Sequence, residues 1–213
     1  MLSRVADNLY WMSRYLERAE HTARLLSVQF NLMLDSTSPA AGQRWSRLLA
    51  NLRSPVDDGH KNNDPYAFMR MMALDSAKSM SIVANIAAAR ENARQVREQI
   101  SSEMWEQINR LYLYARAADT VTMREDEPQR FFGAVKEGAY LFQGITDSTL
   151  THGEGWRYIQ LGRYIERTSA IAALLDVHFS IFPQVPGRAV SLEEYFEWLG
   201  LLKCCTAFEA YCK

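Results

Sequence analysis

The string Arg14-Tyr15-Leu16-Glu17-Arg18 recurs 149 residues later as Arg163-Tyr164-Ile165-Glu166-Arg167. Each copy lies in a long stretch whose apolar residues recur at helical spacing, and the alternation typical of strands is nearly absent from the chain. An offset this large does not fit a stacked repeat. The string therefore predicts an all-α helical bundle with two long central helices. It also suggests an internal duplication, or two helices with matching roles about a pseudo-twofold axis.

Prolines, glycines and capping residues set the bounds of the other expected helices. Asp64-Pro65 places an N-cap before a first-turn proline, and Ser191 with Glu194 forms a capping box. We expect a single domain of about seven to eight helices, at 3–34, 45–52, 65–73, 81–100, 102–118, 128–145, 156–182 and after Ser191. The last helix is still apolar at Phe208 and Tyr211. We therefore expect the domain of residues 1–213 to be C-terminally incomplete.

Composition sets limits on the class of protein. Hydrophobic residues make up 48% and charged residues 23% of 213 residues, an ordinary globular balance. The net charge of -1 gives no general support for nucleic-acid binding. The three cysteines are an odd, clustered set without a disulfide pattern, and neither a signal peptide nor an apolar run of membrane-spanning length is visible. These features predict a soluble cytoplasmic protein with no nucleic-acid or membrane partner.

Helical wheels assign a core face to each long helix. On the first helix this face holds Val5, Leu9, Met12, Leu16, Ala19, Ala23, Leu26 and Phe30. On the second it holds Tyr158, Leu161, Ile165, Ala172, Leu175 and Phe179. The other face of the second helix is also apolar, except for Arg163, Glu166 and Arg167. A helix that is apolar nearly all round is typical of a buried central position, so these charges should be paired with those of the first helix.

We therefore predict a cross-helix network of charged side chains. Its members are Glu17, Arg18, Glu166 and Arg167, flanked by Arg14 and Arg163. Two carboxylates face four guanidinium groups, and the excess of two positive charges invites a bound anion or further acids such as Asp7 or Glu91. Such a network can fix helix register without any chemistry. It can also form a pocket for a carboxylate or phosphate, because arginine forks suit planar bidentate recognition.

Other candidate sites are weaker. Arg90, Arg94 and Arg97 share a helix face, which indicates either a solvated basic stripe or a patch that faces phosphate. Glu17 and His21 form one Glu-x-x-x-His pair, and a di-iron bundle needs two inward Glu-x-x-His pairs. We expect no metal and no cofactor.

Four motifs follow one another along the chain: Asn8–Glu20, Ala89–Arg97, Ser102-Glu103-Met104-Trp105 and Gly155–Arg167. In these motifs the chain resembles the alpha-E family of bacterial α-helical proteins, which is named for a Glu-Arg motif. The resemblance covers essentially the whole chain. It implies gene neighbours or fusion partners that are ATP-grasp-type ligases and transglutaminase-like peptidases, and hence a role in making, modifying or degrading a peptide or amide-linked small molecule.

Three functions remain open from the sequence. The first is an accessory domain of an ATP-grasp-type ligase, whose arginines hold an acidic peptide or phosphate at Arg14, Arg18, Arg163, Arg167, Arg90 and Arg94 together with Glu17 and Glu166. The second is an enzyme that uses Glu17 or Glu166 as acid or base. Nearby arginines should lower the pKa of either carboxyl, which disfavours a base. The third is a purely structural bundle that forms a homodimer.

Overall fold

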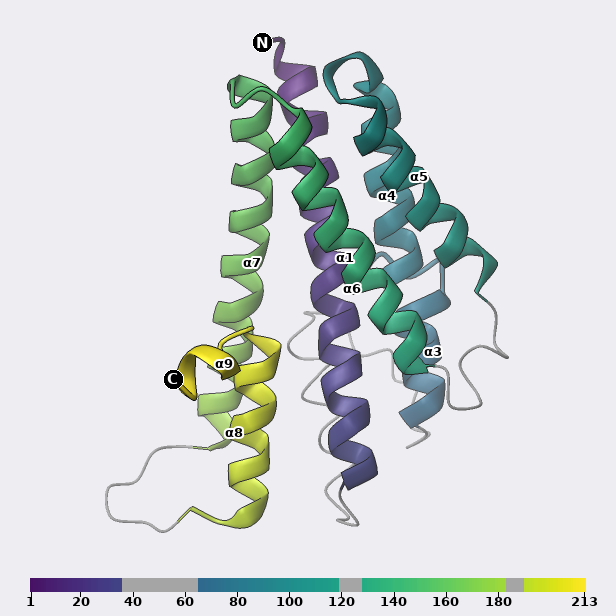
Figure 1. The fold of residues 1–213 in the computed structure, drawn as a ribbon. Coiled ribbons are helices and arrows are strands. Elements are labelled where there is room, and N and C mark those ends of the chain that lie inside the picture. The colour runs from purple at the N-terminus through teal and green to yellow at the C-terminus, as the bar shows by residue number, and fades with distance from the viewer. Residues whose placement is uncertain (36–64, 119–127, 183–189) are drawn as a thin grey trace.

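The computed structural model describes residues 1–35, 65–118, 128–182 and 190–213. Helices account for the regular structure of these residues, and no strand occurs among them, so the predicted all-α fold is confirmed (Figure 1). The helices are α1 Ser3–Asp35, α3 Pro65–Leu74, α4 Ile82–Gln95, α5 Ser102–Ala117, α6 Pro128–Thr149, α7 Glu154–Ile181, α8 Leu192–Cys204 and α9 Phe208–Tyr211, with a 3-10 turn at Arg97–Gln99. The expected helix at 45–52 lies outside the described residues.

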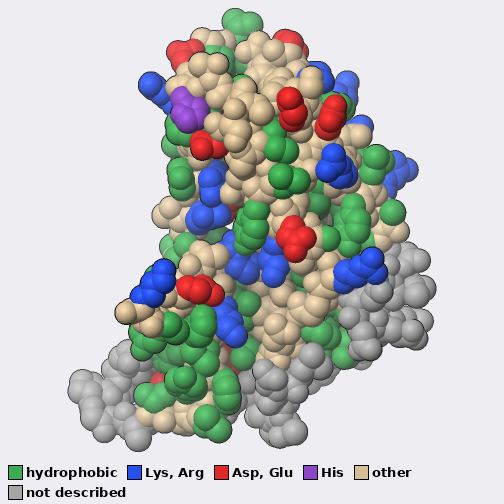
Figure 2. All heavy atoms as spheres, in the orientation of Figure 1, with side chains coloured by type: hydrophobic (Ala, Val, Ile, Leu, Met, Phe, Trp, Pro, Cys, Tyr) green, Lys and Arg blue, Asp and Glu red, His purple; other side chains and the backbone are tan. Residues whose placement is uncertain are grey.

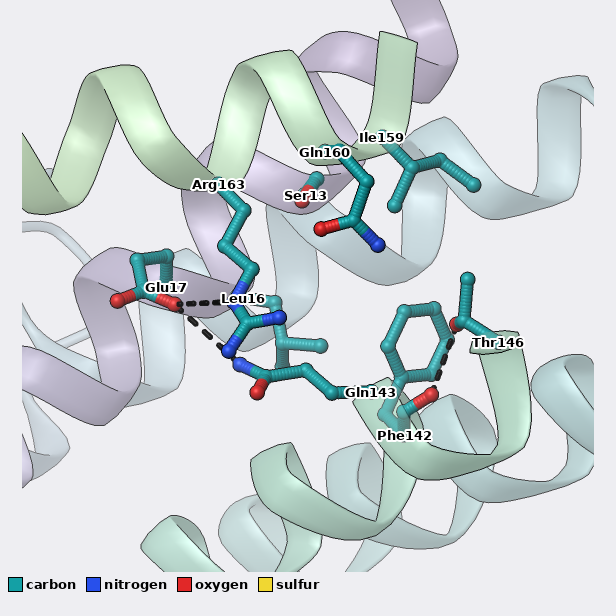
Figure 3. A pocket seen from close by; sticks show the side chains of 9 residues that line it. All are labelled: Ser13, Leu16, Glu17, Phe142, Gln143, Thr146, Ile159, Gln160 and Arg163. Atoms are coloured by element: carbon teal, nitrogen blue, oxygen red, sulfur yellow. Dashed lines mark hydrogen bonds and ion pairs between the residues drawn. The ribbon is translucent and has the colours of Figure 1, made fainter. Parts of the chain in front are cut away.

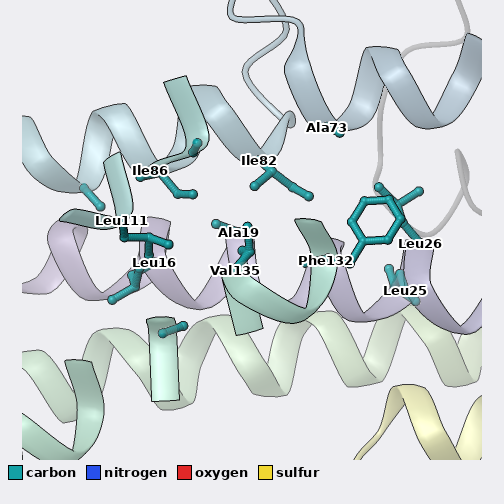
Figure 4. Close-up of a cluster of buried hydrophobic side chains, with 14 of the residues drawn as sticks. Leu16, Ala19, Leu25, Leu26, Ala73, Ile82, Ile86, Leu111, Phe132 and Val135 are labelled. Atoms are coloured by element: carbon teal, nitrogen blue, oxygen red, sulfur yellow. The ribbon is translucent and has the colours of Figure 1, made fainter. Parts of the chain in front are cut away.

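Helix α1 is the centre of the bundle. It packs against α4 on one side and against α6 and α7 on others, while α8 crosses its C-terminal part. Its predicted core face is buried: Leu9, Met12, Ala19, Ala23 and Leu26 have no exposed surface. Figure 4 shows how Ile82 and Ile86 of α4 meet this face. The helical spacing of apolar residues on α1 therefore correctly predicts that α1 is a central helix.

Several helix ends differ from the expected ones. The helix expected at 81–100 ends at Gln95, because Val96 leaves helical geometry and the turn that follows buries both Val96 and Ile100. Helix α6 runs to Thr149, four residues past the expected end. The last helix ends at Cys204 instead of continuing, since Thr206 adopts a positive φ of 56°. This turn separates α8 from the short α9.

Helix caps account for the helix starts. Ser81, Ser101 and Ser191 each accept a hydrogen bond from the backbone N–H three residues later, so each satisfies one of the free donors of a first turn. The sequence also predicts Ser102 as the cap of the helix expected at 102–118, whereas the cap is Ser101 and Ser102 is the first helical residue. Helix α7 begins at Glu154 behind Gly153, two residues before the expected start.

The predicted burial of α7 is wrong. Its expected core residues Tyr158, Leu161, Ile165, Leu175 and Phe179 are between 38% and 48% exposed. The buried face is the opposite one, which holds Ile159, Gly162, Glu166, Leu174 and His178. Helix α7 is therefore a peripheral helix that lies along α1. A helical wheel with apolar residues on both faces does not determine which face packs against the bundle. The face with Arg163, Glu166 and Arg167 packs against α1 because its charges have partners there.

No helix in the described ranges is long and apolar enough to cross a membrane. The cysteines of the C-terminal part are free, and Cys204 lies in the core, where burial raises the pKa of its thiol to about 12. Cys204 thus behaves as a small core residue, as its place in an apolar helix indicates.

Candidate functional site

The two copies of the repeated string lie beside each other on parallel helices. Helices α1 and α7 begin at the same end of the bundle, where the Met1 amino group lies 2.8 Å from Oε2 of Glu154. Farther along, Gly162 faces the backbone of Tyr10 and the side chain of Ser13. A side chain at position 162 would push α1 away, so the glycine permits a close approach of the two backbones. This approach brings the charged side chains within bonding distance.

Glu166 of α7 accepts hydrogen bonds from two arginines of α1. Its Oε2 lies 2.7 Å from Nε of Arg14. Its two oxygens take a bidentate contact from Arg18, with Nε at 2.6 Å and Nη2 at 3.0 Å. Glu166 is only 8% exposed. A carboxylate so buried requires charged partners, and the guanidinium fork matches its geometry.

Glu17 of α1 has the corresponding partners on α7. Nε of Arg167 donates to Oε1 of Glu17 at 2.6 Å, and Nε of Arg163 lies 3.8 Å from Oε2. Gln143 of α6 also donates to Oε2, at 3.3 Å. Glu17 is 2% exposed. The predicted cross-helix network is therefore present, with a neutral donor from α6 added to it.

Positions 149 residues apart exchange roles between the two halves of this network. The Arg14–Glu166 pair corresponds to Arg163–Glu17. The Arg18–Glu166 pair corresponds to Arg167–Glu17. Ser13 and Gly162, which meet at the close approach, are equivalent too. Reciprocal contacts of this kind arise from a twofold axis between the partners. The ion pairs thus follow the predicted pseudo-twofold relation, with the axis running between α1 and α7.

The surroundings make the two carboxyl groups unequal. Burial raises the pKa of Glu17 and outweighs the hydrogen bond from Arg167. Burial also acts on Glu166, but the bonds and charges of Arg18 and Arg14 outweigh it and lower the pKa of Glu166. The expectation that arginines lower both pKa values holds for Glu166 and is wrong for Glu17. Glu17 has one arginine at hydrogen-bond distance, whereas Glu166 has two.

A second buried ion pair extends the network along α1. Arg24 donates to both oxygens of Glu20 one turn away, and Tyr140 of α6 donates to Glu20 Oε1 at 2.9 Å. Glu20 is fully buried. Because Glu20 and Arg24 contribute one charge of each sign, the surplus of two positive charges is unchanged. Sequence reasoning missed this pair, although the four-residue spacing between Glu20 and Arg24 was a signal for it.

His21 gives the network a pH dependence. Burial, with the positive charge of Arg24, lowers the pKa of His21 to about 4. The imidazole is neutral in the folded protein at pH 7, and its contribution to stability is complete above the unfolded pKa of about 6.5. It decreases as the pH falls from there toward the folded value. Since one pKa unit is about 1.4 kcal/mol, we expect the free energy of unfolding to fall by about 2 kcal/mol between pH 7 and pH 5.

Urea denaturation at a series of pH values, followed by circular dichroism, measures this loss. His21→Asn removes the titrating group and should flatten the profile between pH 7 and pH 5. His152→Asn is the matched control, because His152 is exposed at the start of α7 and should leave the slope unchanged. An unchanged slope in His21→Asn would contradict the assignment.

A small cavity lies beside the network between α1, α6 and α7. Figure 3 shows Arg163 and Gln160 of α7 and Gln143 of α6 directed toward it, with Glu17 at its edge. The centre of a water molecule can move within about 10 Å³ of this cavity, so the cavity has room for about one water molecule. Nε of Arg163 and Oε1 of Gln160 are buried without a hydrogen-bond partner among the described residues. The cavity is too small to hold a substrate.

The surplus positive charge reaches the surface. The side chains of Arg14 and Arg18 are each 19% exposed, that of Arg163 is 22% and that of Arg167 is 27%. Figure 2 shows basic side chains gathered midway along the face that holds α6 and α7. The guanidinium of Arg14 also lies over the rings of Tyr10 and Trp11, which holds it in place. A ligand would therefore contact the outer edges of the arginines and not enter the bundle.

Two predicted ligand residues lie elsewhere. Arg90 donates to Asn109 of α5 at 2.7 Å and lies over Trp105 and Tyr112. Arg94 pairs with the exposed Glu91 on its own helix. The structure does not bring Arg90 or Arg94 to the network, and Glu91 does not join it as a further acid. Residues of α4 and α5 hold these side chains in place.

Among the described residues, no group of three or more His, Cys, Asp or Glu side chains is arranged to hold a metal ion. The charges that act on His21 are those of Arg24, Glu166 and Arg167.

One family model matches the whole chain. Residues 1–213 match the Alpha-E family, described as a predicted alpha-helical domain with a conserved ER motif. The chain belongs to the Alpha-E family. Its two ER pairs are Glu17-Arg18 and Glu166-Arg167, the residues at the centre of the network.

The relatives of this Alpha-E domain include uncharacterized mycobacterial proteins. One from Mycobacterium bovis and one from Mycobacterium tuberculosis are each 26% identical over 202 residues, which cover 83% of this chain. The chain spans 22% of the length of these relatives. No solved structure matches. The Alpha-E domain is thus joined to other polypeptide in the relatives.

Proposed function

We propose that this Alpha-E domain is a non-catalytic binding module, in which the ER network joins the two long helices and presents arginines to an acidic group. The observation that carries the proposal is the charge of the network: four guanidinium groups share two carboxylates. Arg163 and Arg167 are bound less completely by Glu17 than Arg14 and Arg18 are by Glu166. Nε of Arg163 lies 3.8 Å from Glu17, and Arg167 donates to Glu17 through Nε alone. An acidic peptide or a phosphate fits their outer edges.

The resemblance to the alpha-E family supports a partner for this module. We propose that it acts beside an ATP-grasp-type ligase, and a transglutaminase-like peptidase, in forming or modifying a peptide or amide bond. An acidic peptide or a phosphorylated group is then the ligand that both proteins would handle. The relatives support a modular role, because the domain is one part of a longer polypeptide in them.

Arg163→Gln tests the binding site with little cost in stability. Arg163 makes no hydrogen bond to Glu17, so its removal should leave the fold intact. We expect a hexaglutamate peptide, titrated by calorimetry at low salt, to bind the wild-type chain. It should bind Arg163→Gln at least tenfold more weakly, a loss of about 1.4 kcal/mol, because the substitution removes one of the guanidinium groups that would contact the peptide. Inorganic phosphate, titrated separately, shows whether phosphate alone suffices.

Arg116→Gln is the matched control, because Arg116 is an exposed arginine of α5 whose contact is to Tyr112. It should bind hexaglutamate as the wild type does. Equal binding by Arg163→Gln and the wild type would reject the site. Co-expression with an ATP-grasp-type ligase tests the partner: a complex should co-elute in size-exclusion chromatography and weaken in Arg163→Gln. Separate elution of the two wild-type proteins counts against the partner.

The enzyme alternative has less support. The lowered pKa of Glu166 makes it a poor base. The pKa of Glu17 is raised, which suits an acid, but the adjoining cavity admits only about one water molecule. An acid or base role for Glu17 stays a prediction. A folded Glu17→Gln variant that retains the full activity of the ligase pathway would exclude an acid or base role for Glu17.

A further inference from the structure

An uncovered apolar row runs along α7 on the side away from α1. Its large members are Tyr158, Leu161, Ile165, Leu175 and Phe179, which follow one another at intervals of three, four, ten and four residues and are 38–48% exposed. Thr168 and Ala172 lie between them in the same row and are exposed as well. The row contains no charged residue between Arg157 and Asp176. A row this long and apolar is unusual on a surface in contact with water.

The pseudo-twofold relation shows what such a face does in this fold. The residues of α1 that correspond to the row are Leu9, Met12, Leu16, Leu26 and Phe30, each 149 positions earlier, and they are 0–7% exposed. Helix α4 lies against this face of α1 at Leu16 and Ala19 (Figure 4), and Tyr66 of α3 packs against Phe30. The corresponding faces of two equivalent helices therefore differ in one respect: the face of α1 is covered by α4 and α3, whereas no described element covers α7 between Tyr158 and Leu175.

The cover on α1 has a definite chemistry. Ile82, Ile86, Ala89 and Ala93 of α4 form its fully buried face. Figure 4 shows Ile86 near Leu16 and Ile82 near Ala19, so α4 runs antiparallel to α1. The alanines, and the small Ala19 and Ala23 of α1, allow the two helices to approach closely. Thr168 and Ala172 keep small side chains at the matching positions of α7.

The described part of α8 leaves most of this row open. Helix α8 meets α7 near its C-terminal end, where the ring of Trp198 lies 4.2 Å from that of His178 on the buried face and 5.5 Å from that of Phe179 in the row. Helix α8 therefore reaches only the last large residue of the row, and the length from Tyr158 to Leu175 stays uncovered by described elements.

We propose that this row of α7 is the docking surface for an antiparallel amphipathic helix of the α4 kind, with isoleucine and alanine on its apolar face, from polypeptide other than residues 1–213. The docked helix would place its isoleucines over Ile165 and Thr168, as α4 places its own over Leu16 and Ala19. The bundle would then repeat the α1–α4 contact about the axis between α1 and α7. This proposal does not depend on ligand binding by the arginines.

A tethered probe tests the proposal. The full chain is extended at its C-terminus by about 15 Gly and Ser residues, whose root-mean-square span of about 20 Å matches the bundle, and then by a second copy of residues 81–96. Tethering raises the effective concentration to about the millimolar range, so weak docking becomes measurable. Hydrogen exchange of the α7 amides is followed by mass spectrometry. We expect at least tenfold slower exchange in α7 than in the unextended chain.

Three controls decide the outcome. A probe whose two isoleucines are replaced by glutamate should give no protection. Ile165→Glu on α7 should abolish protection by the intact probe, whereas Leu113→Glu, at an exposed leucine of α5, should not. Protection that is absent with the intact probe, or that survives Ile165→Glu, overturns the proposal.

Sedimentation equilibrium of the unextended chain tests the competing occupant. We expect a monomer. A dimer that Ile165→Glu dissociates would mean that a second copy of the chain covers the row, and would also overturn the proposal.

Discussion

Gly162→Ala should destabilise the protein by about 3 kcal/mol, because overpacking of a tight contact costs about 1–3 kcal/mol and more where backbone must move. A Cβ at position 162 would overlap the carbonyl group of Tyr10 and would lie 3.3 Å from Cβ of Ser13. A backbone carbonyl in a helix cannot turn aside as a side chain can. The two long helices would have to separate, which also lengthens the ion pairs between them. Urea denaturation followed by circular dichroism measures the loss.

Gly144→Ala is the matched control, since both glycines lie inside helices and a Cβ at position 144 meets nothing within 4 Å. Alanine is about 1 kcal/mol better than glycine in a helix interior. Gly144→Ala should therefore raise stability while Gly162→Ala lowers it. Equal effects of the two substitutions would show that α1 and α7 do not approach closely at Gly162.

Glu166→Ala should cost about 3 kcal/mol, near the lower end of the range for breaking a buried ion pair, because Arg14 and Arg18 can still reach some water. Among the described residues, the substitution removes the carboxylate that both guanidinium groups bond, as each lies 2.6–3.0 Å from its oxygens. Two positive charges are left close together at a largely buried site. Chemical denaturation at pH 7 gives the loss of free energy of unfolding.

Glu91→Ala is the matched control for this prediction. Glu91 also takes a bidentate contact from an arginine, Arg94, but both side chains are more than half exposed. Water replaces the lost partner there, so stability should stay close to that of the wild type. A loss in Glu91→Ala as large as in Glu166→Ala would mean that burial does not set the value of these pairs.

The core of the site was predictable because the repeated string is long and its spacing is helical. The string and the helical wheels together predict Glu17, Arg18, Glu166 and Arg167 as partners, and the structure brings them together. Gln143 and Tyr140 were not found, since α6 has no sequence relation to the string. Which helix would reach the carboxylates from the side is a matter of packing, and no local pattern encodes it.

The orientation of α7 shows a different limit. Both of its faces are apolar, so the helical wheel allowed either one to be the core face. The wheel assigned Ile165 to the core, whereas Ile165 is 39% exposed and Glu166 is 8% exposed. The cost of leaving Glu166 and the arginines without partners exceeds the gain from burying the apolar row against α1. That balance depends on α1 offering matching charges, which requires both helices in place.

The sequence by itself determined the helices, the cap at Ser191 and the two ER pairs, because helical periodicity and capping are local properties of a chain. The tertiary structure decided how those pairs are used. Only the parallel packing of α1 and α7 at Gly162 sets four arginines against two carboxylates, makes Glu17 and Glu166 unequal in pKa, and leaves the apolar row of α7 uncovered. Those outcomes depend on distances between residues about 149 positions apart, and desolvation and ion pairing act over such distances only after the chain has folded.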